Sequence, residues 1–177
     1  TGSCAVLENG EVYCWGRNEG GNQLGVGFEC YSGYYSRGCN GALGLVTPTL
    51  VQLPNGVKAQ SVYSGRDYYT PICIVSTDGD AYCWGENYYG QLGNGNTSTL
   101  YLPAKVYLPS GILSEIQTMA HSRFATCGLW DNGSVYCWGS NTYGKLGDGT
   151  VCEPGMYENN CNGNGAKPII HDPVIFP

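Results

Sequence analysis

Ten cysteines are the residues of this chain whose type and spacing could do chemistry. Six of them form three pairs with nine intervening residues, namely Cys4 with Cys14, Cys73 with Cys83, and Cys127 with Cys137. The other four form two pairs with eight intervening residues, Cys30 with Cys39 and Cys152 with Cys161. Zinc sites favour shorter spacings and often use histidine, of which the chain has only two. The cysteines therefore predict five disulfides, which persist in extracellular and cell-surface proteins.

Catalytic and metal-binding sets are not expected elsewhere in the sequence. His121 is interpreted as a packing or capping residue, because no serine and carboxylate accompany it in a convincing order. Asp78 and Asp80 flank a turn glycine, but two carboxylates are too few for a calcium loop. We therefore expect a non-enzymatic protein without a cofactor or a bound metal.

Two sequons indicate possible modification: Asn96-Thr97-Ser98 and Asn132-Gly133-Ser134. In an extracellular eukaryotic protein each asparagine is a plausible acceptor for an N-linked glycan on an exposed turn. The alternative is that asparagine is simply common in the turns of this chain. Asn96 is the better candidate, since Asn132 falls in a tight loop.

Charge and composition narrow the class of protein. The chain of 177 residues has 8 Lys and Arg against 14 Asp and Glu, a net charge of −6, which argues against nucleic-acid binding. No apolar run approaches 18 residues, so no membrane span is expected. With 28 glycines and 15 tyrosines, the composition favours strands and turns, and predicts an all-β fold.

The elements that carry the cysteines repeat along the chain. Cys-Trp-Gly occurs at residues 14–16, 83–85 and 137–139, and a Gly-x-Leu-Gly segment follows each copy, with one extra residue in the first. Each of the three cysteine pairs with nine intervening residues brackets two strand-like runs with a three-residue loop ending in glycine, which is typical of an antiparallel hairpin. This register places the two cysteines of each pair directly opposite one another, at a separation that suits a disulfide.

Further strands are predicted at residues 49–54 and 104–109, which end in proline, and at 57–63 and 112–119. Four short strands in a repeat of about 50 residues are the pattern of a propeller blade. The whole chain, residues 1–177, is thus expected to be one β-repeat domain. Its blades are expected at about residues 1–56, without a complete N-terminal strand, 57–111 and 112–177.

The segment from Asp78 to Gly93, DGDAYCWGENYYGQLG, resembles the signature of the regulator of chromosome condensation repeat family. That resemblance implies a β-propeller, usually of seven blades, in which the tryptophan and glycines are structural. Trp15, Trp84 and Trp138 are accordingly expected to be mostly buried. Nucleotide exchange and chromatin contact, the functions of the nuclear founder, are not expected of an acidic, disulfide-rich chain.

Copies one and three carry insertions at the same place, about residues 28–44 and 150–166, and each holds one of the shorter-spaced cysteine pairs. The plain interpretation is a surface loop closed by a disulfide. The sharper hypothesis is a contact surface, because the first insertion contains Tyr31, Tyr34 and Tyr35, and tyrosine offers a large contact area at low entropy cost.

Two functions follow as hypotheses. The first is an extracellular structural protein that associates with copies of itself or with neighbouring repeats into a fibre, appendage or surface matrix. Members resembling this family occur in surface appendages such as flagellar hairs, and three repeats are too few to close a ring of the usual kind. The alternative is a secreted binding module that recognises a protein or a carbohydrate through tyrosine-rich loops.

Overall fold

The structure is a computed structural model that describes residues 2–18, 24–30, 33, 39, 41, 43–65, 69–108, 115–155, 161–163, 165–168, 170 and 172–176. These residues form short strands and one 3-10 helix, η1 (Thr142–Gly144). The fold is all-β, as the composition predicts. No helix in the described ranges is long and apolar enough to cross a membrane.

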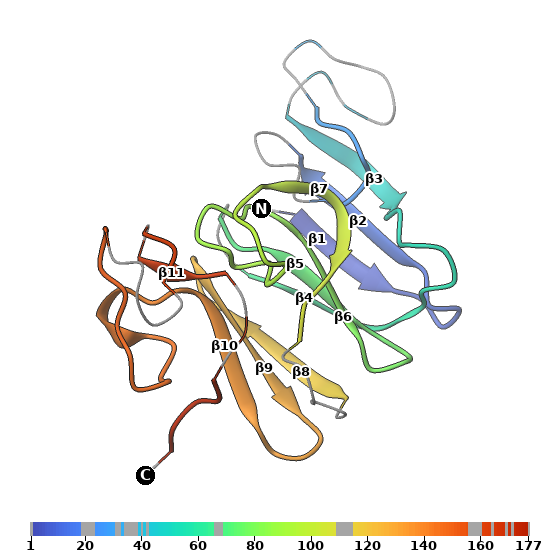
Figure 1. Cartoon of the computed structure of the whole chain (residues 1–177). Coiled ribbons are helices and arrows are strands. Elements are labelled where there is room, and N and C mark those ends of the chain that lie inside the picture. The colour runs from blue at the N-terminus through green and yellow to red at the C-terminus, as the bar shows by residue number, and fades with distance from the viewer. Residues whose placement is uncertain are drawn as a thin grey trace.

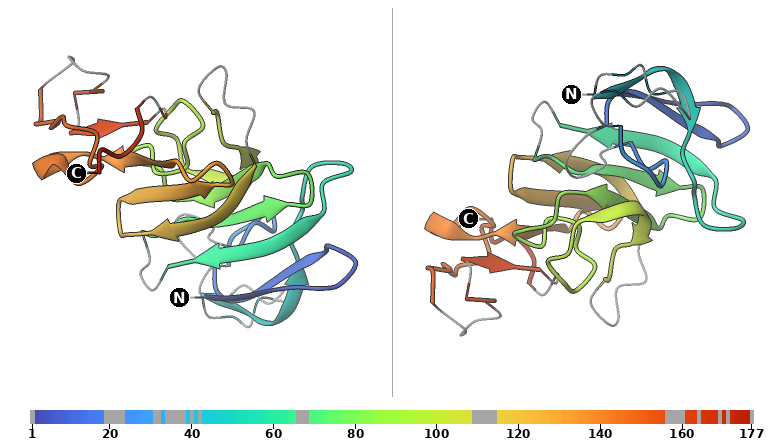
Figure 2. Two further views of the ribbon diagram at one scale, coloured as in Figure 1. Left: turned by 90° about the horizontal axis from the view of Figure 1, so that it is seen from below. Right: turned by 90° about the horizontal axis from the view of Figure 1, so that it is seen from above.

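Three antiparallel sheets lie side by side, with the second between the other two (Figure 1). We call them blades 1, 2 and 3. Blade 1 contains β1 (Gly2–Val6), β2 (Val12–Arg17) and β3 (Gly44–Leu50). Blade 2 contains β4 (Ala59–Ser64), β5 (Ile72–Ser76), β6 (Ala81–Gly85) and β7 (Leu100–Lys105). Blade 3 contains β8 (Ile116–His121), β9 (Ala125–Trp130), β10 (Val135–Ser140) and β11 (Ala166–Lys167). The views along the perpendicular direction show the same succession of sheets (Figure 2).

The hairpin register expected from the cysteine spacing is confirmed in all three blades. Cys4 lies opposite Cys14, and the equivalent pairs in blades 2 and 3 lie opposite one another in the same way. Each turn closes on a glycine with positive φ, 83° at Gly10, 78° at Gly79 and 83° at Gly133, a conformation that glycine adopts without steric cost. The local turn chemistry therefore sets the register of the disulfide-bearing strands.

The last strand of blades 1 and 2 begins earlier than the sequence predicts. The apolar pattern predicts strands at 49–54 and 104–109, whereas β3 and β7 end at Leu50 and Lys105. Both strands contain a proline, which is tolerated because each pairs on one side only. A β-bulge beside Gly16 and another beside Gly85 shift the register of the strand pairing. The apolar pattern of the sequence does not reveal such a bulge.

Each hairpin has two unlike faces. Cysteines and small apolar residues point to one side, which we call the cysteine face, and tryptophan and tyrosine point to the other, which we call the tryptophan face. The core consists of two clusters, and each joins the cysteine face of one blade to the tryptophan face of the next. Cys14 of blade 1 thus shares a cluster with Trp84 of blade 2, and Cys83 shares one with Trp138 of blade 3.

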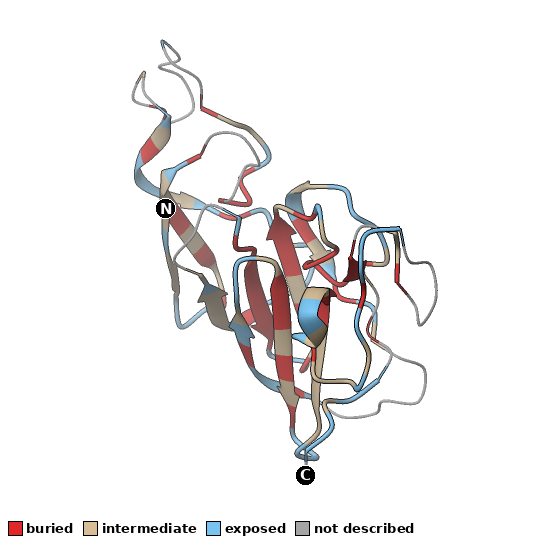
Figure 3. Cartoon of the chain, turned by 90° about the vertical axis from the view of Figure 1, so that its left-hand side faces the viewer, coloured by how far each residue is buried: buried red, intermediate tan, exposed pale blue. Residues whose placement is uncertain are grey.

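Buried residues lie mostly along the strands of the sheets (Figure 3). Trp84 and Trp138 are both fully buried, as predicted. Trp15 falls short of them and is only partly buried, because none of the three blades turns a cysteine face toward it. Conversely, both cysteines of the blade 3 hairpin are partly exposed, whereas Cys73 and Cys83 of blade 2 are fully buried.

Candidate functional site

The contact between consecutive blades is built around a tryptophan that lies against a glycine. A Cβ atom at Gly25 would lie 2.7 Å from Nε1 of Trp84, and one at Gly93 would lie 2.6 Å from Nε1 of Trp138. No side chain larger than glycine fits at either place without displacing the indole ring. The Gly-x-Leu-Gly segment of one repeat is therefore the receptor for the Cys-Trp-Gly tryptophan of the next.

A backbone carbonyl fixes the position of this tryptophan in blade 3. The oxygen of Gln91 accepts a hydrogen bond from Trp138 Nε1 at 3.0 Å and another from the Thr126 hydroxyl at 2.9 Å. The Gln91 side chain is itself buried and holds its own loop, because its Oε1 accepts from the Tyr89 amide at 3.0 Å. Sequence reasoning did not single out Gln91, although it occupies the variable position of Gly-x-Leu-Gly.

A buried asparagine shapes the loop that presents this segment. Asn87 donates from Nδ2 to the carbonyls of Asn96 and Ser98, both at 3.0 Å, and its Oδ1 accepts from the Leu92 amide at 2.9 Å. Asn141 of blade 3 holds Leu146 in the same way, at 3.1 Å. These bonds satisfy buried backbone groups in a loop that has no ladder of its own.

Within the part of the chain that the structure describes, no further blade covers the outermost faces of blades 1 and 3. On the tryptophan face of blade 1, Ser3 and Leu7 are exposed and Trp15 is partly exposed. On blade 3, a hollow of about 500 Å³ is lined by residues that include Ala120, Cys127 and Lys145. One open face of each kind thus remains at opposite ends of the succession of blades.

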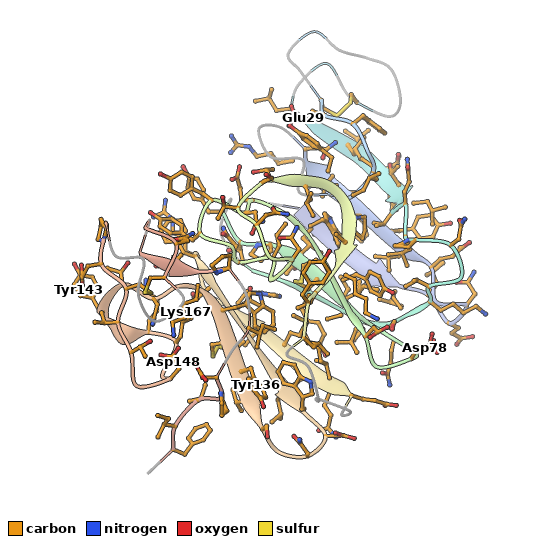
Figure 4. The ribbon with its side chains drawn as sticks, in the orientation of Figure 1. Glu29, Asp78, Tyr136, Tyr143, Asp148 and Lys167 are labelled. Atoms are coloured by element: carbon orange, nitrogen blue, oxygen red, sulfur yellow. A yellow bond between two sulfur atoms is a disulfide. The ribbon has the colours of Figure 1, made fainter. Side chains whose placement is uncertain are left out.

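Tyr143 belongs to η1, on the side of blade 3 that faces away from blade 2 (Figure 4). It is 89% exposed and has a φ of 64°, the positive value otherwise found only at glycines of the described chain. Its counterpart in blade 2, Tyr89, packs on Phe124 of blade 3 with ring centroids 4.7 Å apart. A non-glycine residue held at positive φ stores strain, and such strain is most often found at functional positions.

A second feature is an aromatic cluster at the junction of blades 2 and 3. The guanidinium of Arg123 lies 4.6 Å from the ring centre of Tyr69 and 4.9 Å from that of Phe124. Tyr88 stands beside Tyr89 in an edge-to-face arrangement at 5.0 Å and is 61% exposed. A cation over aromatic rings stabilises the junction, and the exposed rings offer a surface for stacking.

Blade 3 also contains a buried ion pair. Lys167 Nζ lies 2.7 Å from Asp148 Oδ2, and the two side chains are 3% and 5% exposed (Figure 4). Burial alone would raise the pKa of Asp148, but hydrogen bonds from Lys167 and Thr150 outweigh it and hold that pKa below its ordinary value. The sequence patterns did not predict this pair, although the alignment of the repeats places Asp148 with Val26 and Asn94.

His121, the one candidate base considered in the sequence, lies against Thr126. Its Nδ1 lies 3.1 Å from the Thr126 hydroxyl, and burial lowers its pKa to about 4. The described residues contain no group of three or more histidine, cysteine or acidic side chains close enough to share a metal ion.

The structure describes the predicted disulfide and glycosylation residues but not the predicted contact tyrosines. All five disulfides join the expected partners, including the two in the insertions. Asn96 and Asn132 are both exposed, and the side-chain oxygen of each accepts from the amide two residues later, at 2.9 Å. Tyr31, Tyr34 and Tyr35 lie outside the described residues.

Stacked antiparallel blades with a repeated tryptophan and glycine contact define a protein of the β-propeller type. Sequence profiles described as the regulator of chromosome condensation (RCC1) repeat match residues 78–129, and residues 2–22, 62–91 and 122–145. The chain belongs to this family, as the resemblance of its repeats predicted.

Relatives and solved structures agree with this assignment. The ultraviolet-B receptor UVR8 of Arabidopsis thaliana is 31% identical over 147 residues, which are 83% of this chain and 29% of that protein. The mitochondrial RCC1 domain-containing protein RUG3 of the same plant is 30% identical over 151 residues, 85% of this chain and 31% of that protein. The structure of human WBSCR16 matches with a TM-score of 0.67 at 24% identity over 99% of this chain and 35% of that one. Prp20p from Saccharomyces cerevisiae matches with a TM-score of 0.66 at 19% identity, over 99% of this chain and 36% of that one. The chain therefore spans about a third of the length of the proteins that it resembles.

Proposed function

We propose that this chain is a non-enzymatic, extracellular structural protein whose blades associate with copies of itself or with neighbouring repeats into a fibre, appendage or surface matrix. The observation that carries the proposal is the order of faces. Each covered cysteine face meets a tryptophan face, and one face of each kind is open. Open, unlike faces on one body are the requirement for head-to-tail growth.

The disulfides support the extracellular part of the proposal. No cysteine of the chain is free, and half-buried disulfides such as Cys127–Cys137 would be reduced in the cytosol. The test is thiol labelling of native material before and after reduction, combined with negative-stain imaging. Extended assemblies without labelled thiols are expected, whereas isolated particles or free thiols would contradict the proposal.

Glycans on the exposed turns belong to the same proposal. Asn96 and Asn132 each close a turn with the side-chain oxygen rather than with the Nδ2 atom that would carry the glycan. We expect a glycan at Asn96, and a less complete one at Asn132. Intact-mass measurement before and after glycosidase treatment decides this, and an unmodified mass at both sites contradicts it.

A secreted binding module is the second candidate, and the cluster of Arg123 with Tyr69, Tyr88 and Phe124 favours it. Exposed rings beside a guanidinium suit the stacking of a sugar or of an aromatic side chain of a protein. Prp20p, which shares the fold, is described as binding Gsp1p and histones, so a protein ligand has a precedent in that protein. Binding to immobilised glycans or secreted proteins that is lost in Tyr88→Ala, with assembly unchanged, would favour this function.

A further inference from the structure

We propose that Asn55 is a modification site, at which the folded chain deamidates spontaneously and the asparagine becomes aspartate or isoaspartate. Asn55 lies in the connection from β3 of blade 1 to β4 of blade 2, between two described blades. The proposal does not depend on the structural function proposed above, because it concerns the chemistry of a single chain in water.

An asparagine followed by glycine can react with its own backbone, since glycine has no Cβ atom to shield the attacking amide. The glycine nitrogen attacks Cγ of the asparagine, so a bond from that nitrogen to Cγ forms and the bond from Cγ to Nδ2 breaks. The proton of the backbone amide leaves with Nδ2 as ammonia, and a cyclic succinimide remains. Water then opens the ring at either carbonyl, which gives aspartate or isoaspartate.

The dipeptide Asn-Gly recurs along the chain, and the structure describes both residues of the pairs at 9–10, 55–56, 94–95, 132–133 and 162–163. Ring closure requires the glycine amide and the asparagine side chain to turn toward each other. A hydrogen bond on either group slows this step, because the bond must open first. The hydrogen bonds of each pair therefore predict which asparagine reacts.

The pair at 9–10 is held on both groups. The Gly10 amide donates to the Leu7 carbonyl at 2.9 Å, and Oδ1 of Asn9 accepts from the Glu11 amide at 3.0 Å. The pair at 132–133 makes the same two bonds, at 3.0 and 2.9 Å. Both asparagines are exposed, so hydrogen bonding and not burial protects them.

The pairs at 94–95 and 162–163 are protected in other ways. Asn94 is 8% exposed, and its Oδ1 accepts from Nδ2 of Asn87 at 3.1 Å. Asn162 is partly buried, and its backbone amide donates to the Ala166 carbonyl at 3.0 Å. Neither pair combines exposure to water with freedom to rearrange.

The pair at 55–56 combines both. Asn55 and Gly56 are exposed at the centre of a turn that the Val57 amide closes on the Pro54 carbonyl at 3.0 Å. Within the described ranges, neither the Gly56 amide nor the Asn55 side chain makes a hydrogen bond. A Cβ atom at Gly56 would meet nothing within 4 Å, and the same is true of Gly133, where φ is 83° against 82°. The two sites thus differ in their hydrogen bonds and not in their room.

The product alters a hollow of about 630 Å³ between the hairpin tip of blade 1 and this connection. Its lining includes Glu11, Asn55 and Lys58. Deamidation replaces a neutral amide by a carboxylate, so the hollow gains a second negative charge beside Lys58. We therefore expect this part of the surface to become more acidic as the protein ages, before any other described Asn-Gly pair changes.

The experiment compares rates at single sites. The folded, disulfide-bonded chain and the reduced chain in urea are incubated at mildly alkaline pH, and peptide mass spectrometry with electron-transfer fragmentation measures aspartate and isoaspartate at each asparagine. The rate in the folded chain divided by the rate in the unfolded chain removes the effect of neighbouring residues. Asn9 is the matched control, because it is exposed and, like Asn55, lies outside the sequons.

The rate ratio should be near one for Asn55 and lower for Asn9 by about 25-fold, which corresponds to about fivefold for each of its two hydrogen bonds. On native isoelectric focusing, the first acidic band of the aged wild type should be missing in Asn55→Gln, whose longer side chain closes the ring far more slowly. A ratio for Asn55 no higher than that for Asn9, or an unchanged first acidic band in Asn55→Gln, overturns the proposal.

Discussion

Blade 1 and blade 3 have the same hairpin register, the same cross-strand disulfide and the same glycine turn, yet they bury opposite faces. In blade 1 the cysteine face is covered around Cys14, which is fully buried, while Cys4 is partly buried and Trp15 is partly exposed. In blade 3 the tryptophan face is covered and the cysteines are partly exposed. Burial of a given motif residue is therefore decided by the neighbouring blade and not by the hairpin that carries it.

Blades 1 and 3 fill the same two buried positions with different kinds of side chain. Val26 and Leu45 of blade 1 are apolar and buried, at 1% and 2% exposure. The aligned residues of blade 3 are Asp148 and Lys167, which form the buried ion pair. These two positions thus hold an apolar pair in blade 1 and a charged pair in blade 3, and a charged member needs its partner, since an unmatched buried charge is strongly destabilising.

Truncation of a covered tryptophan should have the largest effect on stability. We expect Trp138→Ala to lower the free energy of unfolding by about 3–5 kcal/mol, because it removes a fully buried ring and leaves a cavity. Trp15→Ala should cost about 1 kcal/mol in the monomer, since part of that ring is already solvated. Urea denaturation of both variants measures the difference, and equal losses would contradict the face assignment.

Breaking the buried ion pair should have the next largest effect. Lys167→Met leaves Asp148 without its partner, so we expect a loss of about 3 kcal/mol. The double variant Asp148→Val with Lys167→Leu copies blade 1 and should regain most of that loss. Lys105→Met is the control, because its ion pair with Asp80 is 52% and 32% exposed and should contribute under about 1 kcal/mol. A double variant as unstable as the single one would refute the equivalence of the two positions.

The third prediction concerns His121 and pH. Its pKa is about 4 in the folded chain against an ordinary value of 6.5, so the unfolded chain takes up the proton first as the pH falls. The neutral ring contributes stability that is fully present above about pH 6.5 and is lost progressively toward pH 4, by up to about 3 kcal/mol. Thermal melts of wild type and His121→Gln should diverge across this window. Comparing the two proteins removes the contribution of groups that both contain, such as Glu86, whose pKa is raised by burial. Curves of melting temperature against pH that run parallel would contradict the role of His121.

The smallest expected difference is in disulfide accessibility. Cys73 and Cys83 are fully buried between blades, whereas Cys127 and Cys137 are partly exposed on the open face. Under mild reduction the blade 3 disulfide should therefore be reduced and alkylated first. The two disulfides close loops of equal length, so loop length cannot explain this order. Peptide mapping over time gives the order, and earlier modification of Cys73 would count against the burial pattern.

Much of this fold was predictable because its signals are local. Cysteine spacing and the glycine at the third loop position fix each hairpin within eleven residues, and repetition reveals the blades. The strand ends at Leu50 and Lys105 were missed because a bulge at Gly16 or Gly85 changes the count without changing the apolar pattern. The partial exposure of Trp15 was missed because it depends on a neighbouring blade rather than on its own motif.

The contacts between blades were the least predictable part. The hydrogen bond from Trp138 to Gln91 joins residues 47 positions apart, and its acceptor is a backbone oxygen. No residue type in the sequence therefore indicates it. The partner of Asp148 lies 19 residues away, beyond an insertion that blade 2 lacks. Alignment of the three repeats position by position is the signal that could have found both, because it exposes the shared acceptor and the charged replacement.

Hydroxyl-radical footprinting across a dilution series tests the central claim, that cysteine and tryptophan faces pair and that one of each is open. We predict that Trp84 and Trp138 are protected at every concentration. Trp15 and Tyr143 should react in dilute protein and become protected together as the concentration rises. Protection of Trp15 equal to that of Trp84 in the monomer, or reactivity of Trp15 that never changes while the protein assembles, would contradict the claim.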